Sequence, residues 1–243
     1  MINERDIAEK FSAVWKSNFP LLTPNFIRVY NETQVIKINT NSILKSGELR
    51  YDLVSEVAFN ISAEIYRNEC KVEEFLTDID KMRLILRKVV KLIWRSEGDS
   101  GIDVILSNDE EDDVKKITEN ILEFLNKFSG DKVEFKPEIK GFGFIPKLEA
   151  DLSIGTTLFE IKTVTRNFKS SDFKQLFLYL ALRQVSNQSN WEYAGLYNPR
   201  RGVYCRFHIG NMVSSLSGNK TPNEAFDNLL NSLVRDVEID TKF

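Results

Sequence analysis

The chain has 243 residues, 42% of them hydrophobic, which is enough for a buried core in one large domain or two. Its 33 Lys and Arg against 36 Asp and Glu leave a net charge of −3, so any nucleic-acid binding must use local basic patches. With no apolar run near the ~20 residues of a membrane span, no signal peptide and only two distant cysteines, the sequence argues against a membrane or disulfide-rich secreted protein and favours the cytoplasm.

Residues 1–107 are predicted to form a mostly helical region. Apolar residues recur at helical spacing over residues 3–19, 51–66 and 72–94, whereas residues 26–38 are typical of extended chain. The last of these helices carries cations at intervals of four, which are Arg83, Arg87, Lys91 and Arg95. Such a stripe either follows a phosphate backbone or forms a solvated helix face.

The acidic run at residues 108–113 is the candidate linker to a second domain, residues 108–243. A helix is expected over residues 112–128, because acids at its start suit the helix dipole and an apolar stripe follows. Residues 132–140 are then expected to form the first strand of a sheet.

The strongest chemical pattern lies in the next two predicted strands. Asp151 precedes a hairpin turn at Gly155-Thr156, and Glu160-Ile161-Lys162 follows the turn. Side chains two apart on a strand share a face, so Glu160 and Lys162 are expected to point the same way. Asp151 should present its carboxylate beside them on the neighbouring strand.

This pattern suits a metal-assisted hydrolysis. Asp151 and Glu160 are hard oxygen ligands of the kind that hold Mg²⁺ or Mn²⁺, and the backbone carbonyl of Ile161 could supply another oxygen. Lys162 can orient an attacking water or bind a phosphate. A second acid–apolar–Lys run, Glu138-Ile139-Lys140, makes Glu138 either an additional ligand or a solvated strand end. Acid–x–Lys by itself is also compatible with an ordinary solvated hairpin.

A helix over residues 170–183 follows, with Ser171 or Asp172 as the expected cap. Gln175 and Tyr179 are four residues apart and therefore share one helical face, directed toward the same site.

Two further strands, residues 192–197 and 203–209, flank a turn that carries Arg200 and Arg201. These two arginines could meet phosphates or form a solvated turn. Residues 223–236 are expected to form a closing amphipathic helix.

Together, Asp151, Glu160-Ile161-Lys162 and Gln175-x-x-x-Tyr179 make the chain resemble the PD-(D/E)xK nuclease superfamily, in its RecB-like branch, over roughly residues 112–210. The resemblance implies an α/β (α+β mixed-sheet) fold with a restriction-endonuclease-like αβββαβ core. It assigns metal binding to Asp151 and Glu160, catalysis to Lys162, and support or nucleic-acid contact to Gln175 and Tyr179. Ala150 stands where many members have Pro, and the iron–sulfur cysteines and upstream histidine of some members are missing.

The function that this resemblance implies is Mg²⁺-dependent cleavage of nucleic acid, with DNA as the expected substrate. In size and layout the chain is similar to small nuclease components of bacterial restriction and anti-phage defence systems, which often work beside a separately encoded helicase or ATPase. Two alternatives stay open: a catalytically inactive nuclease fold that binds nucleic acid or a partner, and an assembly subunit whose N-terminal helices mediate contacts.

Overall fold

The computed structural model describes residues 3–39, 43, 49–94, 104–186 and 188–240. Over these residues it is a mixed α/β fold, with ten helices around a sheet that is mostly antiparallel and partly parallel. The strands are β1 (Ile36–Lys37), β2 (Val133–Phe135), β3 (Glu138–Ile139), β4 (Leu148–Glu149), β5 (Leu152–Ile154), β6 (Thr157–Ile161), β7 (Tyr193–Asn198) and β8 (Val203–His208). The helices are α1 (Glu4–Lys10), α2 (Ser12–Asn18), α3 (Pro24–Thr33), α4 (Tyr51–Asn68), α5 (Val72–Thr77), α6 (Ile79–Trp94), α7 (Asn108–Asn126), α8 (Ser170–Val185), α9 (Ile209–Ser217) and α10 (Pro222–Asp240).

Six strands form one sheet in the order β1-β8-β7-β6-β5-β2, and β3 and β4 form a separate pair. The neighbours β6 and β7, which α8 connects, run parallel, and the pairs on either side of them are antiparallel. The predicted hairpin at Gly155-Thr156 is confirmed. Gly155 has a φ of +55°, which glycine adopts without a Cβ clash, and Ile154 pairs with Thr157.

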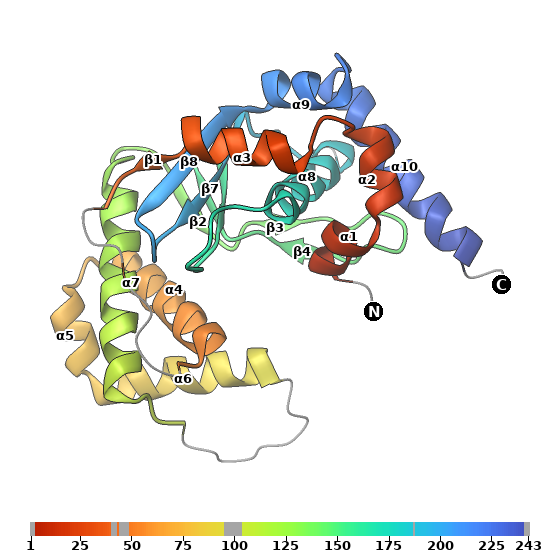
Figure 1. Ribbon diagram of the computed structural model, residues 1–243. Helices are drawn as coiled ribbons and strands as arrows, with labels where there is room; N and C mark the ends of the chain where they lie inside the picture. Colours follow the sequence, from red (N-terminus) through yellow and green to blue (C-terminus); the bar gives the residue numbers. More distant parts are fainter. Residues whose placement is uncertain (1–2, 40–42, 44–48, 95–103, 187, 241–243) are drawn as a thin grey trace.

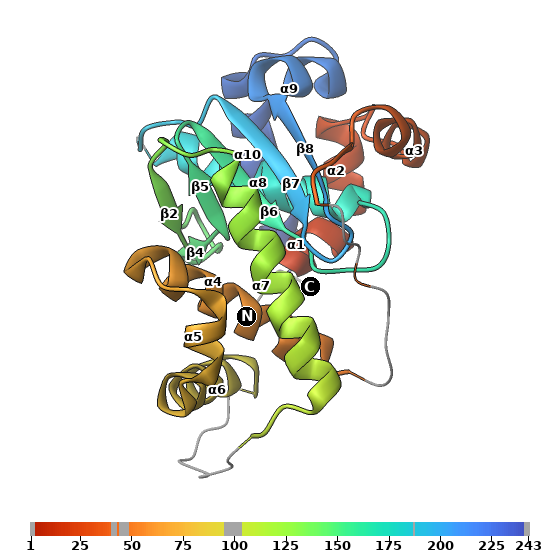
Figure 2. The same cartoon turned by 90° about the vertical axis from the view of Figure 1, so that its left-hand side faces the viewer.

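Helices cover both faces of the six-stranded sheet. In Figures 1 and 2, α7 crosses one face and α8 lies against the other. The alternation of side chains explains this: Leu158 of β6 belongs to the core under α8, whereas its neighbour Phe159 belongs to the core under α7. Glu160 therefore points to the side of α8. Among the described residues, no helix combines the length and apolar composition that crossing a bilayer requires.

The mostly helical N-terminal region packs directly on the rest of the chain. The core under α7 includes residues of α4, such as Val57 and Ile61, and the core under α8 includes Trp15 and Phe19 of the α2 segment. Strand β1 extends the sheet by pairing Ile36 with Tyr204 of β8. The predicted boundary at residue 107 thus does not separate two hydrophobic cores.

The expectation of extended chain over residues 26–38 is wrong for most of that stretch. Thr23 accepts a hydrogen bond from the backbone N–H of Phe26 at 3.1 Å and caps α3, which has Pro24 in its first turn. Ile27 and Tyr30 are buried on one side of this helix. Their spacing of three was a helical signal, and only residues 36–37 pair as a strand.

Two expected helices are each broken into two. The backbone leaves helical geometry at Phe11, between α1 and α2, and at Asp78, between α5 and α6. Asp78 has an extended conformation with ψ 95°, and its carboxylate accepts a hydrogen bond from Lys81 N at 3.1 Å, which favours a new helix start.

The acidic run at residues 108–113 is the start of α7 and not a linker. Ser107 caps the helix, accepting from Glu110 N at 3.3 Å while Glu110 accepts from Ser107 N at 2.9 Å. Glu110 is buried and also accepts from Arg50 Nε at 2.8 Å. Glu110 of the acidic run thus takes part in the N-terminal cap of α7 and also binds Arg50, which lies 60 residues away in the sequence.

The pairing of Arg50 with Glu110 makes the free energy of unfolding depend on pH in the acidic range. Hydrogen bonds from Arg50 lower the pKa of Glu110 from 4.5 to about 2, although its burial opposes the shift. A carboxyl whose pKa is depressed by folding stabilises the protein above its unfolded pKa, and that stability is lost as the pH falls from about 4.5 toward 2. At ~1.4 kcal/mol per pKa unit the full shift would correspond to about 3.5 kcal/mol, but the Arg50 side chain is 42% exposed and solvent screens the pair, so we expect Glu110→Gln to lower the free energy of unfolding by about 2 kcal/mol at neutral pH. Urea titrations at neutral pH and at about pH 3 check this, because the difference between variant and wild type should shrink in acid. A difference that stays constant with pH would contradict the pairing.

Both strands that were expected to be continuous are interrupted beside the site. The segment 132–140 divides into β2 and β3 at Lys136, which has a left-handed φ of +54°. The segment 148–154 divides into β4 and β5 at Asp151. The backbone N–H of Lys136 donates to the carbonyl of Asp151 at 2.9 Å, so the two interruptions face each other.

Candidate active site

One cavity of about 550 Å³ contains the residues of the acid–x–Lys pattern. Strand β6 and helix α8 form one part of its lining, α1, α4 and the end of α6 form another, and Lys136, Glu149, Asp151 and residues 162–164 complete it. Its charged lining residues are Glu4, Arg5, Asp52, Glu56, Lys136, Glu149, Asp151, Glu160 and Lys162. The cavity therefore lies between the sheet and the N-terminal helices, with six carboxylates against three cations.

Asp151 is held at the end of the broken strand. Its Oδ2 accepts a hydrogen bond from the backbone N–H of Ile161 at 2.7 Å. This bond places the Asp151 side chain beside β6, next to Glu160, as the hairpin predicted. The role of the Ile161 carbonyl as a metal ligand stays a prediction, although Ile161 itself lines the cavity.

Four side chains form one continuous hydrogen-bonded chain. Lys162 Nζ donates to Glu160 Oε1 at 2.8 Å and to Gln175 Oε1 at 2.6 Å. Gln175 Nε2 in turn donates to the Tyr179 hydroxyl at 2.8 Å. The predicted shared face of Glu160 and Lys162 and the shared helical face of Gln175 and Tyr179 are both confirmed. Glu160, Gln175 and Tyr179 are buried, and the Lys162 side chain is 11% exposed.

The start of α8 fixes the position of Gln175. The N-cap position is taken by Lys169, and by neither Ser171 nor Asp172, and the Lys169 side chain makes no capping hydrogen bond. Asp172 lies in the first turn, where its carboxylate accepts from Lys169 N at 2.8 Å and from Arg166 Nη1 at 2.7 Å. Asn31 of α3 also accepts from Phe168 N at 3.1 Å and donates to its carbonyl at 2.9 Å. The residues just before α8 are thus anchored to the first turn of α8 and to α3.

Burial and neighbouring charges shift the pKa values of three groups in the cavity. Burial and the neighbouring Glu160 carboxylate raise the pKa of Asp151 well above its usual range. Burial would lower the pKa of Lys162, but Glu160 and Asp151 outweigh that effect and raise it, so Lys162 stays an ammonium. Burial also raises the pKa of the Tyr179 hydroxyl, which is therefore neutral.

The two carboxylates fit a hard divalent cation. Within the described residues, Glu160 Oε2 is buried and has no hydrogen-bond partner. Mg²⁺ is commonly held by one or two carboxylates with several retained waters, so Asp151 and Glu160 are a sufficient donor set. Over the same part of the chain, no group of three or more His, Cys, Asp or Glu side chains gathers as a larger metal cluster.

Glu138 is not brought to this cavity. It lies on β3, its side chain is exposed, and it is bound by Lys147. The register of β3 and β4 explains its place, because Glu138 pairs with Glu149 in the separate two-stranded sheet. Glu149, which lines the cavity, lies nearer to the site.

The arginines of the β7–β8 turn are placed differently from each other. Arg200 is fully buried, its Nη2 lies 2.6 Å from Asp113 Oδ2, and its guanidinium lies over the Tyr51 ring. The predicted phosphate contact of Arg200 is therefore corrected: this residue is an internal counterion of α7. Arg201 is half-buried and donates to Asn167.

The basic stripe of α6 lies partly as predicted. Arg83, Arg87 and Lys91 are exposed, and Arg95 lies outside the described residues. The end of α6 reaches the cavity that contains Asp151 and Glu160 through Leu92 and Ile93. The expected nucleic-acid contact of this stripe stays a prediction.

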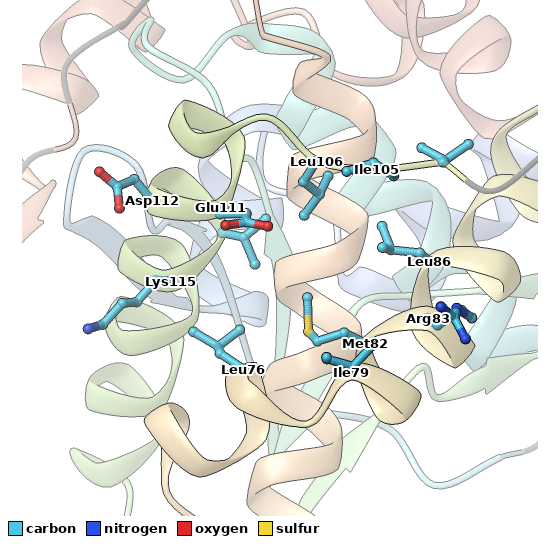
Figure 3. Close-up of a pocket in the computed structure, with 12 residues that line it drawn as sticks. Leu76, Ile79, Met82, Arg83, Leu86, Ile105, Leu106, Glu111, Asp112 and Lys115 are labelled. Carbon is cyan, nitrogen blue, oxygen red and sulfur yellow. The ribbon is translucent and has the colours of Figure 1, made fainter.

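A second cavity, of about 440 Å³, lies near the other end of α6. Figure 3 shows that aliphatic side chains such as Leu76, Leu86 and Leu106 line it, while Asp112 and Lys115 project from α7 on one side. Its charged residues are Glu111, Asp112 and Lys115 of α7 and Arg83 of α6, and within the described part of the chain no hydrogen-bonded chain like that of the first cavity joins them. The active-site candidate is therefore the cavity at Asp151 and Glu160.

Sequence reasoning missed the contribution of α4 and Lys136 to this site. Glu56 of α4 accepts a hydrogen bond from Lys136 Nζ at 2.6 Å, and both line the cavity. The helical spacing of α4 was visible in the sequence, but nothing local indicated which β-strand its polar face would meet.

Comparison with known proteins adds no relative to this description. A scan against protein-family models found no match, and a search of curated proteins found none either. The geometry of the cavity and the chemistry of its side chains therefore carry the functional assignment.

Proposed function

We propose that this protein is a metal-dependent nuclease that hydrolyses phosphodiester bonds of nucleic acid, with DNA as its principal substrate. The observation that carries the proposal is the chain from Glu160 through Lys162 and Gln175 to Tyr179, with Asp151 held beside Glu160 by the N–H of Ile161. Asp151 comes from the acid before the hairpin, Glu160 and Lys162 come from the acid-x-Lys run, and Gln175 and Tyr179 come from the helix that follows.

Asp151 and Glu160 are the residues that would hold Mg²⁺ or Mn²⁺. When bound, such an ion neutralises charge on a phosphate and makes a water easier to deprotonate. An ion also balances the cavity, whose carboxylates outnumber its cations and would otherwise repel a polyanion.

Lys162 supplies the buried positive charge of the site. Its ammonium has three donor hydrogens, of which Glu160 and Gln175 take two. The remaining donor is free to hold an attacking water or a phosphate oxygen. Gln175, supported by the neutral Tyr179 hydroxyl, fixes the ammonium on the side of Glu160.

The fold is compatible with the restriction-endonuclease-like core that we propose. In chain order, α7 precedes β2, β5 and β6, and α8 then leads to β7 and β8. This order corresponds to αβββαβ with an added strand. A role in bacterial defence against phage, beside a separately encoded helicase or ATPase, is the biological setting that we propose for such a nuclease, in the cytoplasm.

The proposal is tested with purified full-length protein on supercoiled plasmid and on linear DNA. We expect cleavage with Mg²⁺, none with EDTA, and a loss of about 10² or more in rate for Asp151→Asn, because the amide cannot replace a charged ligand. Calorimetry should show weaker Mg²⁺ binding by Asp151→Asn, which separates loss of the ion from loss of fold. A wild-type protein that binds DNA equally well with Mg²⁺ and EDTA, and never cuts it, would instead be a non-catalytic binding protein.

A further inference from the structure

Lys136 is the second lysine of the cavity, and the proposed function does not use it. It follows the last residue of β2, where its φ of +54° lies in the left-handed region that favours glycine. A lysine that retains this conformation is held there by its surroundings, and such strained positions gather at functional sites. The left-handed turn ends β2 and lets the side chain lie beside α4.

The backbone of Lys136 is fixed to the proposed metal site. Its N–H donates to the carbonyl of Asp151 at 2.9 Å, so its position is tied to that of the Asp151 backbone. Its Nζ donates to Glu56 Oε1 at 2.6 Å and lies 5.7 Å from the centre of the Phe59 ring. Asn60 of α4 donates to the same Glu56 oxygen at 3.0 Å and holds that carboxylate in place.

Another anion can easily replace Glu56 as the partner of the Lys136 ammonium. Its side chains are 32% and 31% exposed, and pairs at this level of exposure contribute little to stability. Lys162, in contrast, is buried and has two of its three donor hydrogens bonded to Glu160 and Gln175. Lys136 is therefore a cation of the cavity that is both fixed beside Asp151 and available to a ligand.

We propose that Lys136 is a substrate-binding residue that contacts a backbone phosphate of the nucleic acid, and that Glu56 occupies its ammonium until the substrate arrives. This inference rests on the proposed nuclease function and assigns the phosphate contact on the α4 side of the cavity. A lysine suits the task because its compact charge on a flexible stem can move from a carboxylate to a phosphate.

Substitutions of Lys136 and of Glu56 should then change DNA affinity in opposite directions. An ion pair with a purely structural role would not give opposite changes. Lys136→Met should raise KM and the Kd for a fluorescein-labelled DNA duplex about fivefold and leave kcat within about twofold. Glu56→Gln should lower KM and Kd about twofold, since the competing carboxylate is removed. The salt dependence of binding should lose about 0.9 from its slope in Lys136→Met, the amount expected for one phosphate contact.

Fluorescence anisotropy in EDTA gives Kd without cleavage, and initial rates with Mg²⁺ give KM and kcat. Lys147→Met is the matched control, because Lys147 forms an exposed pair with Glu138 outside the cavity. Equal Kd values for Lys136→Met and Lys147→Met, or a shift of Lys136→Met and Glu56→Gln in the same direction, would overturn the assignment. A wild-type protein that binds DNA but does not cut it would overturn the proposed nuclease activity alone, and the anisotropy series would still decide the role of Lys136.

Discussion

Lys162→Ala is expected to abolish metal-dependent DNA cleavage, with a fall of about 10³ in rate. The ammonium is the one charged donor between Glu160 and Gln175, and an alanine leaves nothing to hold a water or phosphate there. Mg²⁺ binding should persist, because both proposed ligands remain. Single-turnover cleavage of linear DNA measures the rate, and calorimetry measures the ion.

The chain supplies its own control for this experiment. Lys140 ends the second acid–apolar–Lys run, but it is exposed and lies outside the cavity. Lys140→Ala should cleave DNA at the wild-type rate. Intact cleavage by a folded Lys162→Ala protein would show that the site is assigned to the wrong residues.

The largest effect on stability is expected at the buried ion pair of Arg200 and Asp113. Both side chains are almost completely inaccessible, and Arg200 Nη2 lies 2.6 Å from Asp113 Oδ2. Arg200→Met keeps most of the volume but leaves an uncompensated carboxylate inside the protein. Breaking such a pair costs about 3–5 kcal/mol, a large share of the stability of a typical domain.

Urea denaturation of the purified variants measures this loss. The double variant Arg200→Met with Asp113→Leu should recover part of it, because no charge then remains buried without a partner. Arg201→Met, one residue along the same turn, should cost about 1 kcal/mol or less, since Arg201 is half-exposed. A loss for Arg200→Met as small as that for Arg201→Met would mean that Asp113 does not depend on its guanidinium.

The arrangement of the candidate site was predictable because its geometry is local. Strand alternation places Glu160 with Lys162, a tight turn at Gly155 returns the chain to Asp151, and the helical repeat aligns Gln175 with Tyr179. Each relation spans a few residues, so the sequence determines it without knowledge of the rest of the fold.

Features that depend on distant partners were not predictable in this way. Arg200 meets Asp113 across the molecule, so a turn that looked solvated is buried. Lys136 meets Glu56 of α4, and Arg50 satisfies Glu110 in an acidic run that resembled a linker. From the sequence alone, a charged side chain is predicted to face solvent. Only the tertiary structure shows which charged side chains are buried beside a counterion.

The edges of the six-stranded sheet have a consequence for behaviour at high concentration. One edge is the two-residue β1 and the other is the three-residue β2, which is followed directly by the left-handed Lys136. Short edges interrupted by a kink offer few unpaired backbone groups to the sheet of a second molecule. The architecture therefore disfavours strand-to-strand stacking between copies, a common route by which β-containing proteins aggregate.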